Sequence, residues 1–410
     1  MKPIGKVELG IDVFLKNHIQ KLKKDRIGLV CNHASLNSDL IPTADLLIKK
    51  HKLNIIKILA PEHGIKGIAE AGEQVDSFID DRYGIPVFSL YDITKAAELS
   101  NSGSLDESMR IFDVLKKGKT ANQEILTGID TIIFDLQDVG TRIYTYASTL
   151  LYLMESGVKS GIKIIILDRP NPINGKDIEG PLLKYPEFSS FIGVAPIPIR
   201  HSMTIGELAR FFNGELLKNS VDLEIILMNG WKREMYFEDT GLHWINPSPN
   251  LPTPKSVYVY PGQVLFEGTN VSEGRGTTLP FEILGAPWIN GYKMVDILNN
   301  LNIDGVKFIE TYFSPHFSKY RGDFCSGLRI EITDKIIYKP FKTTLHIISE
   351  LFSLYQNGLK FHSSYFDHVC GTTSIRKSIL NGIQPEKICN SFNSDLEKFK
   401  DLRNRYILYS

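Results

Sequence analysis

Short apolar runs alternate with segments of helical periodicity through the first half of the chain. Each run ends in a polar, Gly- or Pro-containing turn, as buried strands do. The runs are residues 26–32, 54–61, 84–91, 130–140, 163–172 and 222–230, and the helical segments are 43–51, 146–161 and 204–214. Strands that alternate with helices predict a parallel sheet with helices on both faces, the α/β class.

The sequence changes character beyond about residue 232. Residues 244–254 are Pro-rich, and residues 267–282 are rich in Gly, Thr and polar side chains, so neither stretch favours a helix or a strand. Because the second stretch has so few apolar residues, we expect it to lie outside the core, as a long binding loop. Helix, strand, strand and helix are predicted after it, at 291–301, 306–313, 326–333 and 341–355. We therefore divide the chain into an α/β domain at residues 1–240 and a smaller α+β domain at residues 241–410.

Composition is that of an ordinary globular protein. The chain has 410 residues, enough for two domains, with 42% hydrophobic and 23% charged residues. Lysine plus arginine and aspartate plus glutamate each number 47, which gives no support for a nucleic-acid partner. No apolar run of about 20 residues predicts a membrane span. The N-terminus shows no signal peptide, which predicts a cytoplasmic protein, or a periplasmic or secreted one if a leader was removed.

Titratable residues gather where the predicted strands end. The segments "PEHG" (61–64), "QDVGTR" (137–142) and "DRPNP" (168–172) each come at the end of an apolar run. In a parallel sheet, ligands bind beyond the carboxyl ends of the strands. These segments should therefore converge, and Glu62 and His63 in the first of them are candidates for chemistry.

Familiar cofactor and nucleophile motifs are missing from the sequence. It has no G-x-G-x-x-G after the first strand, no Walker A sequence, no H-E-x-x-H and no G-x-S-x-G, so we expect no cofactor and no common serine nucleophile. Zinc would accept three ligands from the acids and histidines at the strand ends, but no pair has a ligand spacing, and we expect no metal. Those residues are His33, Glu62, His63, Asp138, Asp168 and His201.

Paired carboxylates offer a different chemistry. Hydrolysis of a glycosidic bond needs one acid to protonate the leaving oxygen and a second group to deliver or stabilise the nucleophile. The acids in predicted loops are Glu62, Asp138, Asp168, Glu179, Glu267 and Glu273. Glu62 follows an apolar strand and a proline, where desolvation would suit a catalytic acid. The alternative role for Glu62 is that of a salt-bridged turn residue.

Basic and aromatic residues near these turns are candidates for binding. Arg142 would bind a ligand carboxylate through two hydrogen bonds or form an ion pair with Asp138. Tyr144 and Tyr146 would contact a sugar or pack in the core. Arg200 and His201 precede a predicted helix, capped by Thr204, whose N-terminus would suit an anion.

Together these motifs resemble a bacterial family of exo-β-N-acetylmuramidases, formerly a domain of unknown function. The resemblance covers about residues 8–335 and rests on motifs that include "APEHGIKG", "AGEQVDS", "DLQDVGTRIYTY", "LDRPNPING", "PIPIRHSMTIGELARFFN" and "VYPGQVLFEGTNVSEGRGTTLPFEILGAPWI". It implies a Rossmann-like domain, a smaller C-terminal domain, and a site in the cleft between them. It also implies release of β-1,4-linked N-acetylmuramic acid from the non-reducing end of peptidoglycan fragments, with Glu62 essential.

The resemblance and the residues together define one candidate site. We expect Glu62 to be the catalytic acid, or a group that acts first as acid and then as base. His63, Asp138 and Tyr144 are the other candidate catalytic residues. Because N-acetylmuramic acid carries a lactyl carboxylate, its site should offer cations and amide donors. The candidate binding residues are Arg142, Tyr146, Asp168, Arg169, Asn171, Arg200, His201, Asn250, Glu267, Asn270, Glu273 and Arg275. The alternatives are a non-catalytic muropeptide- or carbohydrate-binding protein and a metal-dependent ester or amide hydrolase.

Overall fold

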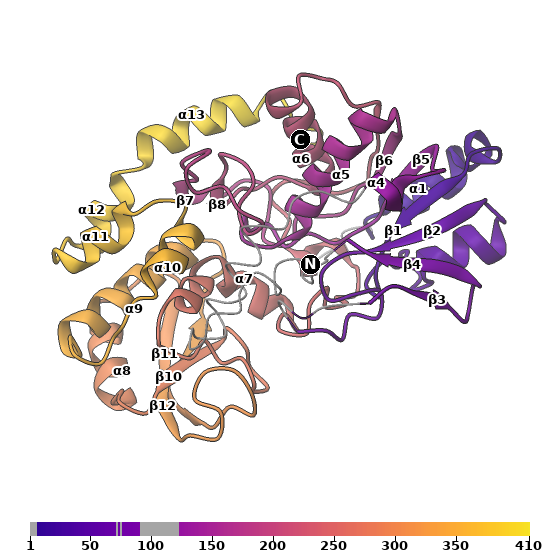
Figure 1. The fold of residues 1–410 in the computed structure, drawn as a ribbon. Coiled ribbons are helices and arrows are strands. Elements are labelled where there is room, and N and C mark those ends of the chain that lie inside the picture. Colours follow the sequence, from indigo (N-terminus) through magenta and orange to yellow (C-terminus); the bar gives the residue numbers. More distant parts are fainter. Residues whose placement is uncertain (1–5, 71–72, 74–75, 91–122) are drawn as a thin grey trace.

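The computed structural model describes residues 6–70, 73, 76–90 and 123–410 (Figure 1). Residues 71–72 and 74–75 of the motif "AGEQVDS" lie outside this set, as does Tyr91 at the end of the apolar run 84–91. None of the helices in the described ranges has both the length and the apolarity of a membrane span.

A seven-stranded sheet in the order β3-β4-β2-β1-β5-β6-β9 forms the centre of the first half (Figure 1). Its strands are β1 (Ile27–Val30), β2 (Ile55–Ala60), β3 (Phe78–Asp80), β4 (Ile85–Ser89), β5 (Thr131–Phe134), β6 (Lys163–Leu167) and β9 (Leu223–Ile226). Neighbours run parallel, except that the edge strand β3 is antiparallel to β4. Every apolar run of the first half forms one of these strands. The strand order reverses between β1 and β5, which is where sheets of this kind bind ligands.

Alternate residues of one strand pack on opposite faces of the sheet. In β5, Ile132 and Phe134 share a core with α5 (Tyr146–Ser160) and α6 (Ile205–Phe211). Ile133, between them, packs instead in a core with α1 (Gly10–Asn17). All three side chains are 0% exposed, and each such burial stabilises the fold by about 1.5–3 kcal/mol. The predicted Rossmann-like sheet with helices on both faces is confirmed.

Shorter helical segments complete the first half. They are η1 (Ile19–Leu22), η2 (Asp45–Lys50), α4 (Gln123–Leu126), η3 (Phe212–Leu216) and η4 (Phe237–Thr240), and a two-stranded sheet pairs β7 (Glu179–Leu182) with β8 (Pro198–Arg200). The predicted helix 43–51 is the π-helical η2. At the start of α6, Thr204 and Glu207 form the reciprocal capping box that their spacing predicts.

The second half contains a three-stranded antiparallel sheet and a group of helices. Its strands lie in the order β10 (Ile283–Ala286), β12 (Cys325–Ile332) and β11 (Val306–Phe313). Its helices are α7 (Pro254–Gln263), η5 (Val264–Gly268), α8 (Gly291–Asn300), α9 (Pro340–Leu354), α10 (Ser363–Cys370), α11 (Ser374–Leu380), α12 (Pro385–Asn390) and α13 (Asn393–Arg403). This is the predicted α+β architecture, although the sequence pattern did not predict α7, η5, β10 or the helices from α10 onward.

The Gly- and Thr-rich stretch 267–282 is largely buried, so the expectation that it lies outside the core was wrong. Thr269, Val271, Ser272 and Glu273 are 0, 0, 1 and 2% exposed. Hydrogen bonds make this burial possible, because the backbone amide of Ser272 donates to Gly285 at 2.9 Å and so joins the stretch to β10. A polar composition therefore did not exclude this segment from the interior.

The last residues of the chain return to the first half. Beyond α13, Tyr409 donates from its hydroxyl to Asp168 at 2.6 Å, and the amide of Leu408 donates to Glu207 at 2.9 Å. Figure 1 shows α13 leading from α12 toward a C-terminus that lies beside α6. The division of the chain between residues 240 and 241 stays a prediction. These contacts join the last residues of the predicted second domain to the first domain, in addition to the covalent connection at residue 240.

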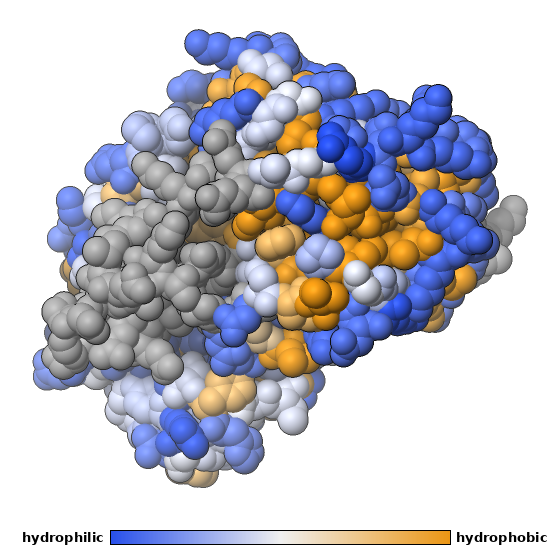
Figure 2. All heavy atoms as spheres, turned by 45° about the vertical axis from the view of Figure 1, so that its right-hand side comes forward, coloured by the Kyte–Doolittle hydropathy of each residue, from blue (hydrophilic) through white to orange (hydrophobic). Residues whose placement is uncertain are grey.

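Apolar side chains gather on one face of the first half. Figure 2, in which the side of the molecule that carries β2, β3 and β4 comes forward, shows a hydrophobic area bordered by hydrophilic residues. Exposed apolar side chains of this part of the chain include Ile68, Phe78 and Ile79, which are 79, 38 and 67% exposed. The edge strand β3 therefore presents large apolar groups to its surroundings.

Candidate active site

The turn that follows β2 has a strained backbone. His63, Gly64 and Gly67 adopt φ angles of 72, 73 and 67°, in the left-handed region. For a residue with a Cβ, such as His63, this conformation costs about 1–3 kcal/mol, and strain of this kind clusters at functional sites. Gly67 is required for a second reason, because a Cβ there would lie 1.9 Å from the ring of His33. The turn is therefore held in one shape, with Glu62 at its start.

Glu62 lies in a pocket at the carboxyl end of β2. The pocket contains about 520 Å³ of empty space, part of it open to solvent. Glu62 is 5% exposed, and its Oε2 accepts a hydrogen bond from Thr145 Oγ1 at 2.5 Å. Thr145 immediately precedes α5, so a sheet turn and a helix start meet at this carboxyl group. The pocket is lined by Glu62, His63, Ile143, Tyr144, Thr145, Ile192, Ser248, Leu251, Tyr260, Glu267, Arg275, Phe281 and Tyr365.

The second half of the chain supplies another carboxylate to the same pocket. Glu267, in η5, accepts hydrogen bonds from Arg275 Nη2 at 2.6 Å and from Tyr365 Oη at 2.8 Å, one on each oxygen. Its side chain is 13% exposed, so it is accessible from the pocket. The guanidinium of Arg275 also lies over the ring of Phe281, at 5.0 Å from the centroid. These contacts hold Glu267 in one orientation.

Tyrosines provide neutral donors on the pocket wall. Burial raises the pKa of Tyr144, Tyr260 and Tyr365 well above the ordinary value of 10.0. All three phenols are therefore protonated at neutral pH, which suits hydrogen-bond donation and not nucleophilic attack. The hydroxyl of Tyr144 is itself buried, and its ring packs against that of Tyr146 with the centroids 4.7 Å apart, so Tyr144 forms part of the pocket wall.

The pocket brings together part of the site that the sequence predicted. Glu62, His63, Tyr144, Glu267 and Arg275 all line it. His63 Nδ1 lies 2.8 Å from the carbonyl oxygen of Ala69, so Nδ1 carries the ring proton and Nε2 is the acceptor. Segments near residues 62, 144 and 267 therefore meet, as predicted from the strand ends and the polar stretch.

Asp138 and His201 form a buried pair away from the pocket lining. Asp138 Oδ2 accepts from Gly140 N at 2.7 Å and lies 3.4 Å from His201 Nε2. Because Met203 N donates to His201 Nδ1 at 3.2 Å, the ring proton lies on Nε2 and faces Asp138. Asn171 donates to the carbonyl of the same Met203 at 2.9 Å. These side chains hold the turns after β5, β6 and β8 together. Asp138 does not line the pocket, although, in addition to burial, its charge, like that of Glu62, raises the pKa of the pocket residue Tyr260.

Arg142, expected at a carboxylate, binds backbone carbonyls instead. It is 1% exposed and donates to the carbonyl oxygens of Pro181, Ile197 and Val369 at 2.9, 2.8 and 2.9 Å. Pro181 lies in β7 and Val369 in α10, so this guanidinium joins the two halves of the chain. Its side chain does not line the pocket. It contacts neither a substrate-binding position there nor Asp138, the two partners expected from the sequence.

Arg169 and Arg200 are likewise held in buried ion pairs away from the pocket lining. Arg169 Nε lies 2.6 Å from Asp135, and Arg200 Nη1 lies 2.8 Å from Glu179. Both guanidinium groups are at most 5% exposed. Neither side chain lines the pocket, so neither contacts a ligand bound there.

Tyr146 and Asn250 hold loops behind the pocket. Tyr146 is 0% exposed, and its hydroxyl donates to the carbonyl of Pro247 at 2.9 Å while accepting from Asn32 at 2.8 Å. Asn250 donates to Glu70 at 2.6 Å. The Pro-rich stretch 244–254 is thereby tied to the turn that carries Glu62. Both side chains position the pocket without lining it.

Asn270 and Glu273 hold the Gly- and Thr-rich stretch in place without lining the pocket. Asn270 donates to the carbonyl of Gly358 at 2.7 Å. Glu273 lies 2.9 Å from Lys319 and 3.3 Å from Arg275. Burial alone would raise the pKa of Glu273, but Lys319 and Arg275 outweigh it, so the pKa is lowered and the group stays charged. Glu273 therefore holds Arg275 at Nε, beside the Nη2 that donates to Glu267.

Asp168, a predicted binding residue, accepts hydrogen bonds from Thr204, Gly206 and Tyr409 at 2.8, 2.8 and 2.6 Å. Asp168→Asn replaces an acceptor oxygen by a donor, so one of these partners is left unsatisfied in the core. We expect the free energy of unfolding to fall by about 1–3 kcal/mol in urea denaturation, with KM unchanged. Asp130→Asn, at a surface pair with Arg26, is the control and should have a smaller effect. A raised KM with unchanged stability would instead support a binding role.

Sequence reasoning missed Thr145, Tyr260 and Tyr365. Thr145 had a signal, since it lies between Tyr144 and a predicted helix, where threonine acts as a cap. Tyr260 lies in α7 and Tyr365 lies in α10, two helices that were not predicted. Nothing in the local sequence around Tyr365 indicates that its hydroxyl reaches Glu267, 98 positions earlier.

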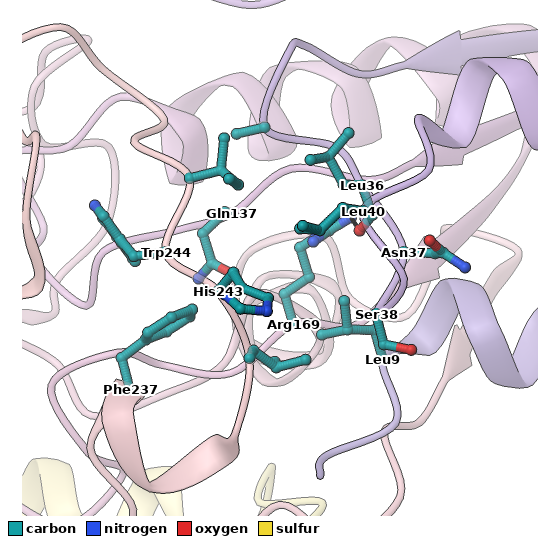
Figure 3. A pocket seen from close by; sticks show the side chains of 13 residues that line it. Leu9, Leu36, Asn37, Ser38, Leu40, Gln137, Arg169, Phe237, His243 and Trp244 are labelled. Carbon is teal, nitrogen blue, oxygen red and sulfur yellow. Dashed lines mark hydrogen bonds between the residues drawn. The ribbon is translucent and has the colours of Figure 1, made fainter.

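A second cavity lies beyond the carboxyl ends of β1, β5 and β6 (Figure 3). Its empty space is about 410 Å³, and Gln137, Arg169, Phe237, His243 and Trp244 are among the side chains that surround it. No carboxylate of the described residues lines this cavity. Across the same described ranges, no group of three or more His, Cys, Asp or Glu side chains is arranged to hold a metal ion. The pocket at Glu62, where carboxyl groups from both halves of the chain meet, is the candidate active site.

Comparison with known proteins identifies the family. Models described as the N-terminal and C-terminal parts of exo-β-N-acetylmuramidase NamZ match residues 27–255 and 258–409. The chain is also 42% identical over 405 residues to the peptidoglycan β-N-acetylmuramidase NamZ of Bacillus subtilis (strain 168), a match that covers 98% of this chain and 92% of that protein.

Solved structures agree with this assignment. Two crystal structures of DUF1343 family proteins from Bacteroides fragilis superpose with TM-scores of 0.85 and 0.75, each at 29% identity over 99% of both chains. The resemblance read from the motifs is confirmed: the chain belongs to the exo-β-N-acetylmuramidase NamZ family.

Proposed function

We propose that this protein is an exo-acting glycoside hydrolase that releases β-1,4-linked N-acetylmuramic acid from the non-reducing end of peptidoglycan fragments. The family description and the name of the Bacillus subtilis relative support this activity. The observation that carries the proposal for this chain is that Glu62 and Glu267, from opposite halves of the sequence, line one pocket. Two carboxyl groups are the usual requirement for hydrolysis of a glycosidic bond.

The two carboxyl groups have different surroundings, which suit different roles. Glu62 is buried beside a hydroxyl donor and is the proposed acid. It gives its proton to the glycosidic oxygen as the bond from that oxygen to the anomeric carbon breaks. Glu267, held by Arg275 and Tyr365, faces the positive charge that develops at the anomeric carbon. Water then supplies the new hydroxyl group, and its proton restores Glu62.

Arg275 is the proposed contact for the lactyl group. It is the cation among the described residues that line the pocket. Its bonds to Glu267 and Glu273 engage Nη2 and Nε, and a guanidinium has five donors in all. We place the lactyl carboxylate of the substrate at the remaining nitrogen, Nη1. A glucosamine glycoside lacks this carboxylate and would forfeit the charge-assisted contact.

A panel of aryl β-glycosides and a mixture of purified muropeptides test the proposal. We expect the wild-type protein to release N-acetylmuramic acid, detected by mass spectrometry, and to prefer the aryl muramic acid glycoside over its N-acetylglucosamine counterpart by about 10-fold or more. Saturable binding without any released sugar would favour the non-catalytic alternative. Activity that a chelator abolishes and zinc restores would favour a metal-dependent hydrolase.

A further inference from the structure

Thr145 occupies the position before α5 at which a threonine commonly caps a helix, yet its side chain accepts no hydrogen bond from the helix. The same chain shows the ordinary behaviour elsewhere. The hydroxyls of Thr204 and Thr253 each accept from the backbone amide three residues later. Thr145 Oγ1 donates to Glu62 Oε2 instead, at 2.5 Å. Thr145 has helical backbone angles (φ −75°, ψ −7°), as does Thr373 before α11, which also forms no side-chain cap. The backbone therefore leaves the Thr145 hydroxyl available to a carboxyl group of the pocket.

The contact is buried, and both of its partners are held from behind. Glu62 is 5% exposed and Thr145 is 6% exposed. The carbonyl of Thr145 accepts from the amide of Thr149 at 2.9 Å and from its hydroxyl at 3.1 Å, which fixes the start of the helix. Glu62, for its part, begins the strained turn at His63. The hydroxyl and the carboxyl group thus meet in a geometry that neither segment can easily leave.

We propose that Thr145 is a positioning residue for Glu62, an inference that rests on the proposed function. The Thr145 hydroxyl binds Oε2 of Glu62 and so orients the carboxyl group of Glu62. When Glu62 gives its proton to the leaving oxygen, the same bond becomes a bond to an anion and strengthens. An interaction that is stronger in the transition state than in the ground state raises kcat more than it improves substrate binding. Thr145 acts through Glu62 and needs no contact with the reacting atoms.

The test compares Thr145→Ala with Thr145→Ser, which differ by one hydroxyl group. On the natural disaccharide linkage we expect Thr145→Ala to lower kcat roughly 10- to 100-fold, the size of one hydrogen bond to a charged group. KM should change less than about threefold, and Thr145→Ser should recover most of the lost rate. Ser148→Ala is the matched control, because it removes a buried hydroxyl of the same helix that makes no hydrogen bond within the described residues and does not line the pocket. Thermal unfolding of each variant shows that it is folded.

The identity of the leaving group provides a readout that a purely structural role would not change. A 2,4-dinitrophenyl glycoside needs little help from an acid, so the deficit of Thr145→Ala should nearly vanish on it. In a Glu62→Gln background, Thr145→Ala should cost nothing further, because the two residues act as a unit.

Three results would overturn the inference: wild-type kcat in Thr145→Ala, no recovery in Thr145→Ser, or an equal deficit on all leaving groups. These outcomes leave the proposed function intact as long as the wild-type protein releases muramic acid. If the wild-type protein releases none, the proposed function itself fails.

Discussion

Replacing Glu62 by glutamine is expected to lower kcat on the natural disaccharide linkage by about 10²–10⁴-fold, the range that general acid catalysis contributes. Glutamine has the size of glutamate, and its side-chain oxygen can still accept from Thr145, so the pocket should keep its shape. It cannot give a proton to the leaving oxygen. Steady-state kinetics on the disaccharide and on aryl glycosides measure the effect, and KM should change little.

The leaving group and a matched variant make this prediction specific. The loss in Glu62→Gln should shrink steeply as the leaving group improves, since a good leaving group departs without protonation. Glu70→Gln is the control, because Glu70 lies in the same loop but bonds to Asn250 outside the pocket lining. If Glu62→Gln keeps more than a tenth of wild-type kcat on the disaccharide, Glu62 is not the acid.

Removal of the Glu267 carboxylate is the second large effect. Glu267→Ala should lower kcat by about 10³-fold or more on every leaving group, because the positive charge at the anomeric carbon then has no anion facing it. This differs from Glu62→Gln, whose loss depends on the leaving group. Added azide should restore part of the rate and yield a glycosyl azide, because the truncated side chain leaves room for a small anion. Kinetics and NMR of the product measure both effects.

The prediction for Glu267 has a matched control variant and an alternative mechanism that the same measurements distinguish. Glu282→Gln is the matched variant, since Glu282 is 3% exposed and pairs with Lys255 at 3.4 Å but does not line the pocket. It should retain kcat even if it is less stable. The acetamido group of the substrate can itself act as a nucleophile in some glycosidases. Strong inhibition by a thiazoline analogue, together with no azide product from Glu267→Ala, would assign the attack to that group instead.

The carboxyl ends of the strands, and so the side of the sheet that carries the site, were predictable from the sequence. The direction in which each side chain points was not. Apolar runs that end in polar turns locate strand ends, and this was enough to find Glu62 and His63. Arg142 follows β5 just as Glu62 follows β2, yet its guanidinium turns to backbone carbonyls behind the pocket. A long cation in a buried turn satisfies whichever acceptors are nearest, and those come from segments distant in sequence. Spacing along one strand carries no information about them.

The residues that complete the site show the same limit. Glu267 and Arg275 could be proposed because their stretch is polar and Gly-rich. That same composition wrongly suggested exposure, because the partners that satisfy its buried groups, such as Lys319 for Glu273, lie elsewhere in the sequence. Tyr365 belongs to a short helix whose own pattern indicates only a core position. Its role depends on a hydroxyl that reaches Glu267, and only the folded chain reveals that contact.

The end of the polypeptide is a structural part of the first half, and this limits how the protein can be shortened. Termini usually tolerate trimming because few contacts hold them. Here, removal of only Tyr409 and Ser410 would withdraw a donor from Asp168, 241 positions upstream of that tyrosine. A fragment that stops at the boundary between the two family models would lose the same donor, so the N-terminal part is expected to be poorly stable when produced alone.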